Sequence, residues 1–193
     1  MLMIRHRVNT LRELKTVPRH MGIELDLRNE GSRLILQHDP YRTGESFECL
    51  LKKYHHAMMI VNVKSEGLEM EALELLKRYG VRNYFFLDLS WPALVRLVRK
   101  GEKNIALRFS EHELMEQCLV FKGKVRWVWI DCFTRLPLNR KSYAALKKYY
   151  KMCIVSPELE GHPKQKIELF RQKLRPYDID AVCTKYPELW QPS

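Results

Sequence analysis

Apolar residues recur along this chain in short runs that alternate with segments of helical periodicity. The nearly unbroken apolar run at 57–63 (AMMIVNV) is typical of a parallel strand that is buried on both faces. The next segment, 68–79, carries apolar residues at helical spacing on one face, and Gly80 stands at its end. The pattern therefore predicts a strand followed by a helix, the unit from which parallel sheets are built.

The same alternation runs through the whole chain, eight times in all. The predicted strands are 1–4, 23–27, 57–63, 83–89, 104–109, 125–130, 152–155 and 179–183, and the predicted helices are 10–17, 45–55, 68–79, 90–100, 110–119, 140–150 and 164–174. Eight such units indicate an α/β protein with a (β/α)8 TIM barrel as its single domain, 1–193, compact beside the roughly 250 residues that are typical. A doubly wound open sheet is the alternative, but the chain has no glycine-rich phosphate loop of the kinds such sheets use.

The second predicted strand carries two acids in an apolar setting. Glu24 and Asp26 are two residues apart, so their side chains project from the same face of a strand. A turn at 29–32 and an apolar run at 33–37 predict a small β excursion that returns the chain to His38. Two carboxylates on a buried face need a cation or hydrogen-bond donors, because burial without them costs several kcal/mol.

Polar residues stand at the carboxyl ends of the predicted strands, where barrel enzymes build their active sites. They are His6, Arg7, Glu24, Asp26, Asn62, Lys64, Asp88, Arg108, Asp131, Glu158, Thr184 and Lys185. This mixture of acids, bases and cations suits a phosphate ester.

The formal net charge of +11 is carried mostly by segments that read as amphipathic helices, so a solvated outer face accounts for much of it. A phosphorylated substrate or an anionic membrane surface would also account for it, whereas no nucleic-acid-binding motif accompanies the charge. No apolar run is long enough to cross a bilayer, and the first residues are too charged for a signal peptide. The five cysteines form no C-x-x-C pair, so a disulfide framework or zinc site is not expected and a reducing cytoplasm is the simpler location.

Four short motifs together resemble the glycerophosphodiester phosphodiesterase family. They are His6-Arg7, Asn9-Thr10, the acidic pair within 22–26, and His38-Asp39 after the β excursion. The family pattern has an H-R-G strand end, an E-N-T helix start, an E-x-D pair and an H-D pair. Weaker similarities lie at 60–64, 89–91 and 178–187. The family fold is a (β/α)8 barrel, shared with phosphatidylinositol-specific phospholipase C.

The resemblance implies a hydrolase acting on a phosphodiester small molecule, a glycerophosphodiester or related phosphorylated headgroup. His6 and His38 would be the acid–base pair. Arg7, Lys64 and Lys185 would bind the phosphate. In the family reaction a substrate hydroxyl attacks its own phosphorus, the alcohol leaves, and the cyclic phosphate is hydrolysed.

The resemblance also implies a divalent cation, Ca²⁺ or Mg²⁺, held by Glu24, Asp26 and Asn62. The family has a glutamate where this chain has Asn62, so the cation affinity is expected to be lower. Glu24 and Asp26 could instead form salt bridges with Arg7 and Lys64 without a metal.

Two further departures from the family pattern leave a second function open. Val8 replaces the glycine after His-Arg, and Lys185 replaces the aspartate of the last motif. A catalytically weakened barrel that binds a phosphorylated ligand or glycan intermediate without turnover is therefore the alternative. The sequence does not predict an oligomeric state.

Overall fold

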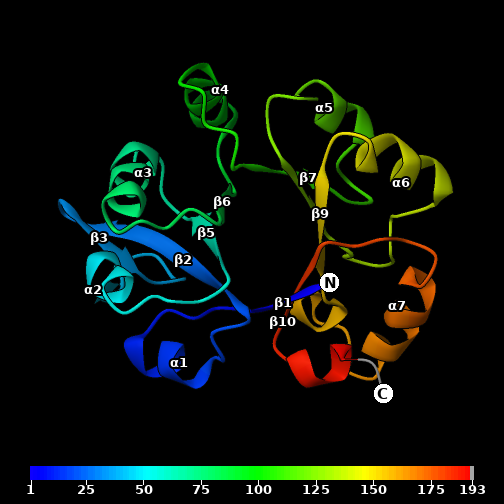
Figure 1. Cartoon of the computed structure of the whole chain (residues 1–193), viewed down its shortest axis with the longest axis horizontal. Coiled ribbons are helices and arrows are strands. Elements are labelled where there is room, and N and C mark those ends of the chain that lie inside the picture. Colours follow the sequence, from blue (N-terminus) through cyan, green and yellow to red (C-terminus); the bar gives the residue numbers. More distant parts are fainter. Residues whose placement is uncertain (192–193) are drawn as a thin grey trace. The chain divides into compact units, whose positions relative to one another are not determined.

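A computed structural model describes residues 1–191 of the chain, which form two compact units. One unit comprises Met1–Arg5 with the described residues from Ile105 to Gln191, and the other comprises His6–Asn104. We call them the C-terminal unit and the N-terminal unit, and Figure 1 colours them along the sequence.

The N-terminal unit is built on a sheet in which β4, β3, β2, β5 and β6 are neighbours in that order. Its elements are α1 (Leu11–Thr16), β2 (Gly22–Glu30), β3 (Arg33–Leu36), β4 (Glu45–Ser46), α2 (Phe47–Leu51), β5 (Met58–Val63), α3 (Glu69–Arg78), β6 (Tyr84–Leu87) and α4 (Trp91–Arg99). β2, β5 and β6 are parallel, whereas β3 and β4 are antiparallel additions. The β excursion after the second strand is therefore present, and Figure 1 shows α2 beside β3.

The C-terminal unit has an all-parallel sheet in the order β1, β10, β9, β8, β7. Its elements are β1 (Leu2–Arg5), β7 (Ala106–Phe109), α5 (Met115–Leu119), β8 (Trp127–Ile130), α6 (Arg140–Lys147), β9 (Lys151–Val155), the 3-10 helix η1 (Pro157–Glu160), α7 (Lys166–Leu174), β10 (Ala181–Thr184) and the 3-10 helix η2 (Pro187–Trp190). With the excursion set aside, eight strands each precede a helix along the described chain; the apolar pattern predicted the eight strands and the helices after the first seven, and η2 follows the last strand.

Local hydrogen bonds explain where the predicted boundaries were wrong. β2 extends through Asn29 and Glu30, which were expected in the turn, because both pair with residues of β3. The helix predicted from Ser110 begins only at Met115, since the Ser110 hydroxyl accepts the backbone N–H groups of His112 and Glu113 and holds a turn. The helix expected over 45–55 is reduced to α2, preceded by the short strand β4.

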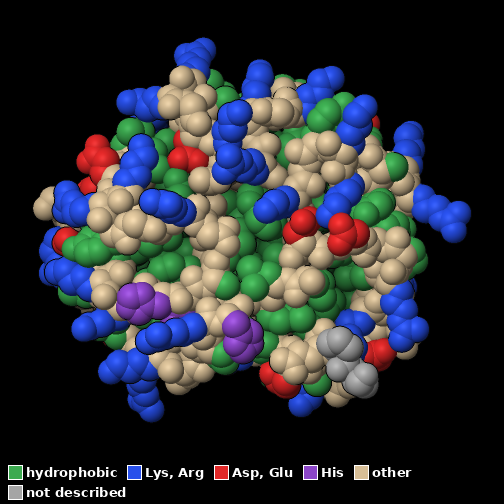
Figure 2. All heavy atoms as spheres, viewed as in Figure 1, with side chains coloured by type: hydrophobic (Ala, Val, Ile, Leu, Met, Phe, Trp, Pro, Cys, Tyr) green, Lys and Arg blue, Asp and Glu red, His purple; other side chains and the backbone are tan. Residues whose placement is uncertain are grey.

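Lys and Arg side chains are scattered over the face seen in Figure 2. All five cysteines are free thiols, and four of them are buried. Among residues 1–191, no helix has both the length and the apolar character that a membrane crossing requires.

Candidate active site

Glu24 and Asp26 occupy the buried strand β2 of the N-terminal unit, and each is only 1% exposed. The alternate residues Ile23, Leu25 and Leu27 are completely buried apolar side chains. β5 lies parallel to β2 with Asn62 in register with Asp26. Sheet pairing thus brings Asn62, from a separate part of the sequence, to the acidic pair.

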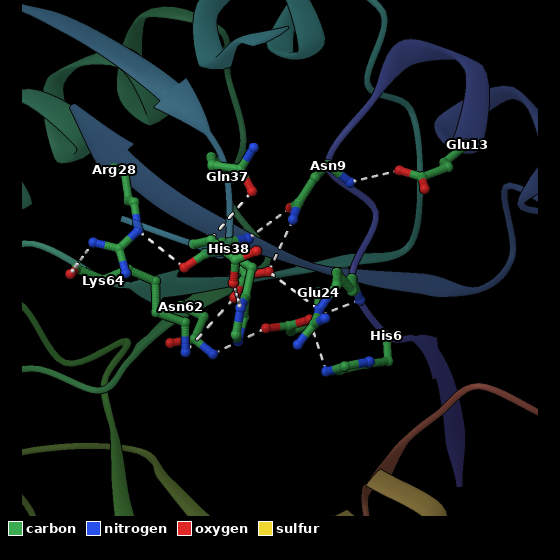
Figure 3. Close-up of polar contacts among 12 residues, drawn as sticks. His6, Asn9, Glu13, Glu24, Arg28, Gln37, His38, Asn62 and Lys64 are labelled. Atoms are coloured by element: carbon green, nitrogen blue, oxygen red, sulfur yellow. Dashed lines mark hydrogen bonds and ion pairs between the residues drawn. The ribbon is translucent and has the colours of Figure 1, made fainter. Parts of the chain in front are cut away.

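Glu24 accepts hydrogen bonds at both carboxylate oxygens. Oε2 accepts the backbone N–H of Arg7 at 2.8 Å, and Oε1 accepts Nδ2 of Asn62 at 3.0 Å (Figure 3). Nε2 of His6 lies 3.7 Å from Oε2. Burial, followed by the negative charge of Asp26, raises the pKa of Glu24 to about 7. Burial thus favours the protonated form of this carboxyl group, which lies beside an imidazole.

Asp26 is surrounded by donors and cations. Its Oδ2 accepts Nδ2 of Asn9 at 2.8 Å, and its backbone N–H donates to Oδ1 of the same Asn9. The guanidinium Nε of Arg7 lies 3.7 Å from Oδ2, and Nζ of Lys64 lies 3.6 Å from Oδ1. Lys64 also contacts Asp88 at 3.3 Å. Two cations therefore balance the charge of this buried carboxylate.

His38 is anchored through its ring and through its backbone. Nδ1 lies 2.8 Å from Oδ1 of Asp39, which leaves Nε2 as the other proton-carrying position of the ring. Nε of Arg28 donates to the carbonyl of His38, and Nη1 of Arg28 donates to the carbonyl of Lys64. Arg28 thus ties the histidine loop to the end of β5, as Figure 3 shows.

The structure brings seven of the predicted residues into one unit and leaves the eighth in the other. His6, Arg7, Glu24, Asp26, His38, Asn62 and Lys64 belong to the N-terminal unit. Lys185 follows β10 in the C-terminal unit, where its backbone N–H donates to Glu158.

The acids at the strand ends of the C-terminal unit, Glu158 and Asp131, contact other residues of the same unit. Glu158 accepts the hydroxyls of Ser156 and Thr184 as well as the Lys185 N–H. Asp131 pairs with Arg108 and accepts Nε1 of Trp129 at 2.9 Å.

Sequence reasoning missed Asn9, Arg28 and Asp39 as site residues. Asn9 directly precedes Thr10, which caps α1 together with Glu13, and the Asn9 amide hydrogen-bonds Asp26. Asp39 was visible as the neighbour of His38 in the H-D motif. Arg28 lies on β2, two residues beyond Asp26. Its part in the site is evident only from its hydrogen bonds to the carbonyls of His38 and Lys64, which are distant in sequence.

The donor set does not fit a resident divalent cation well. A hard cation such as Ca²⁺ takes six to eight oxygen ligands. Every carboxylate oxygen of Glu24 and Asp26 already faces a nitrogen donor or cation, and Asn62 turns its NH2 group toward Glu24. Oδ1 of Asn62 is a buried oxygen without a hydrogen-bond partner, and it is uncharged. Within residues 1–191, no group of three or more His, Cys, Asp or Glu side chains is arranged to hold a metal.

Comparison with known proteins shows which solved structures share the fold of this chain. No family model and no curated sequence matches the chain. A putative glycerophosphoryl diester phosphodiesterase from Agrobacterium tumefaciens matches with a TM-score of 0.72 at 12% identity, over 98% of this chain and 95% of its own. A glycerophosphodiester phosphodiesterase from the same organism matches at 0.66 and 14% identity, covering 98% and 97%. A glycerophosphoryl diester phosphodiesterase from Parabacteroides distasonis matches at 0.69 and 10% identity, covering 98% and 84%.

The chain therefore has the (β/α)8 fold of glycerophosphodiester phosphodiesterases over nearly its whole length. The fold that the motif resemblance implied is confirmed. At 10–14% identity the comparisons speak to the fold, and the chemistry rests on the residues of this chain.

Proposed function

We propose that the protein is a phosphodiester hydrolase that acts on a glycerophosphodiester or a related phosphorylated headgroup. The observation that carries the proposal is that two imidazoles each have a carboxylate partner at one site: His38 with Asp39 at 2.8 Å and His6 with Glu24 at 3.7 Å. A histidine supported by a carboxylate is suited to take a proton in one step and return it in the next. The fold of the three solved phosphodiesterases supports the same reaction class.

Each residue has a task that follows from its chemistry. One imidazole removes the proton from the attacking substrate hydroxyl, and the other donates a proton to the departing alcohol. Arg7 and Lys64 supply positive charge for the phosphate oxygens, whose charge changes as the phosphorus becomes pentavalent. Arg7 has a positive φ of 54°, an uncommon backbone conformation that its N–H bond to Glu24 helps to hold.

Binding without turnover is the second candidate function. Val8, where the family pattern has glycine, is buried at 1% exposure, and its backbone N–H bonds Glu24 O. Asn62 stands where the family has a glutamate. A barrel altered in this way could retain phosphate binding through Arg7 and Lys64 while chemistry is lost.

Product analysis separates the two functions. Purified protein is incubated with glycerophosphocholine, glycerophosphoethanolamine or a chromogenic phosphodiester, with and without Ca²⁺ or Mg²⁺, and products are followed by ³¹P NMR. Appearance of a phosphomonoester or cyclic phosphate supports the hydrolase. Saturable binding of these compounds without any product, under every ionic condition, supports the binding protein and overturns the hydrolase.

A further inference from the structure

Lys64 places its positively charged ammonium group beside Asp26 of the acidic pair. It follows the last residue of β5, and its side chain is 20% exposed. Nζ lies 3.6 Å from Asp26 Oδ1 and 3.3 Å from Asp88 Oδ2. Arg7 approaches the same Asp26 from the other oxygen at 3.7 Å. The buried carboxylate thus has positive charge on both sides from the chain itself.

The donors around the two carboxylates leave little for a metal to bind. A metal bound to Asp26 Oδ1 would lie beside the Lys64 ammonium, and two like charges this close repel strongly in a buried setting. At Oδ2 the amide of Asn9 already donates at 2.8 Å. Glu24 is held by the Arg7 N–H and by Asn62 in the same manner.

The side-chain amide of Asn62 supplies a further donor to the acidic pair. Its NH2 group donates to Glu24 Oε1 at 3.0 Å, which satisfies an oxygen that a cation would otherwise be needed to neutralise. A glutamate at the same place would put a third carboxyl group beside Glu24 and Asp26, and an added cation would balance its negative charge. The amide therefore removes the requirement for a metal at the point where β5 meets β2.

We infer that Lys64, together with Arg7, replaces the divalent cation, so that this site binds a phosphate group without a metal. Asn62 is the positioning residue that makes the replacement possible. This inference rests on the proposed function for its substrate, but its prediction about metal binding does not depend on turnover. The Lys64 ammonium has three N–H donors; one hydrogen-bonds Asp88 Oδ2 at 3.3 Å, and Asp26 Oδ1 lies 3.6 Å away as an ion-pair partner, so the group has donor capacity left for a phosphate oxygen.

The test measures metal and phosphate binding directly. The full chain is freed of ions with EDTA and titrated by calorimetry with Ca²⁺, Mg²⁺ and inorganic phosphate, and its melting temperature is measured in each ion. The variants are Lys64→Met and Asn62→Glu, with Lys103→Met as a control that removes an exposed lysine away from the site.

Wild type and Lys103→Met are expected to show no heat and no change of melting temperature with either metal ion, while both bind phosphate. Lys64→Met is expected to weaken phosphate binding at least about tenfold, the scale of one lost charged hydrogen bond. Asn62→Glu is expected to gain a rise in melting temperature with Ca²⁺. If Asn62→Glu does not fold, the metal titration of wild type and the phosphate affinity of Lys64→Met still test the inference.

Saturable binding of Ca²⁺ or Mg²⁺ by wild type, abolished by Glu24→Gln, would overturn the inference. Unchanged phosphate affinity in Lys64→Met would overturn the role of Lys64. Hydrolysis by wild type only when a divalent ion is added would also overturn it while leaving the hydrolase proposal intact. Lack of any hydrolysis alongside metal-free phosphate binding would overturn the hydrolase and support the inference.

Discussion

Nδ1 of His38 lies 2.8 Å from Oδ1 of Asp39, its neighbour in sequence. The hydrogen bond from His38 is the main reason that the pKa of Asp39 lies below its usual range, and the charges of Arg7 and Arg42 contribute. The carboxylate is therefore ionised at neutral pH and holds the imidazole in one orientation. This pair rests on a loop whose backbone is fastened to the sheet by Arg28.

Asp39→Asn is expected to lower kcat by about tenfold and to leave KM nearly unchanged. The amide keeps the shape of the side chain but loses the charge that supports the protonated ring, so the proton-transfer step suffers more than binding. Steady-state kinetics on glycerophosphocholine measure the effect. Glu71→Gln, which removes an exposed acid on α3, is the matched control. Equal kcat in Asp39→Asn and wild type would show that Asp39 does not position His38.

Asn9→Ala is expected to lower the free energy of unfolding by about 1–3 kcal/mol. The variant leaves the buried Asp26 without its donor at Oδ2 and without the acceptor for its backbone N–H. Urea unfolding followed by circular dichroism measures the change.

The control for this prediction is Asn29→Ala, because the side-chain amide of Asn29 donates to the Gly31 carbonyl at an exposed position. A loss no greater than in Asn29→Ala would contradict the importance of the Asn9–Asp26 pair.

The parts of the fold that follow from local pattern could be predicted from sequence. The run that forms β5 is apolar on both faces, and the Ser90 cap with Pro92 marks the start of α4, so both elements were expected nearly where they lie. Boundaries decided by distant partners were missed. β2 continues to Glu30 because β3 pairs with it, whereas the sequence of 29–32 alone resembles a turn.

In the candidate site, too, some features follow from local sequence and others depend on distant partners. The two-residue spacing of Glu24 and Asp26 indicated a shared face, and both contact Arg7 in the structure. The role of Asn9 was not predictable, because the same asparagine is equally suited to cap a helix. Salt bridges of the acidic pair with Arg7 and Lys64 were an open alternative to a metal site, and the one between Asp26 and Lys64 depends on the register of β2 with β5.

Stability is expected to depend on the ionisation of Asp131 in the C-terminal unit. Burial raises the pKa of Asp131 to about 7, against the favourable charge of Arg108. The pKa of Asp131 is higher in the folded protein than in the unfolded chain, so the folded state binds this proton more tightly. The resulting stabilisation of the folded state is fully present below the unfolded pKa, near 4, and is lost as the pH rises through about 7.

Asp131→Asn removes this titration. The free energy of unfolding of wild type is expected to fall more steeply between pH 4 and pH 7 than that of Asp131→Asn, as measured by urea unfolding at each pH. Parallel pH profiles for the two proteins would contradict the raised pKa.

The central claim is that His6 and His38 carry phosphodiester hydrolysis. The most direct measurement is the initial rate of glycerophosphocholine hydrolysis by wild type, His6→Ala and His38→Ala, with the exposed His20→Ala as the control. Wild type and His20→Ala are expected to turn over substrate at similar rates, and each site variant is expected to lose about 10²-fold or more. Undetectable hydrolysis by wild type, or rates in His6→Ala and His38→Ala equal to that of His20→Ala, would contradict the claim.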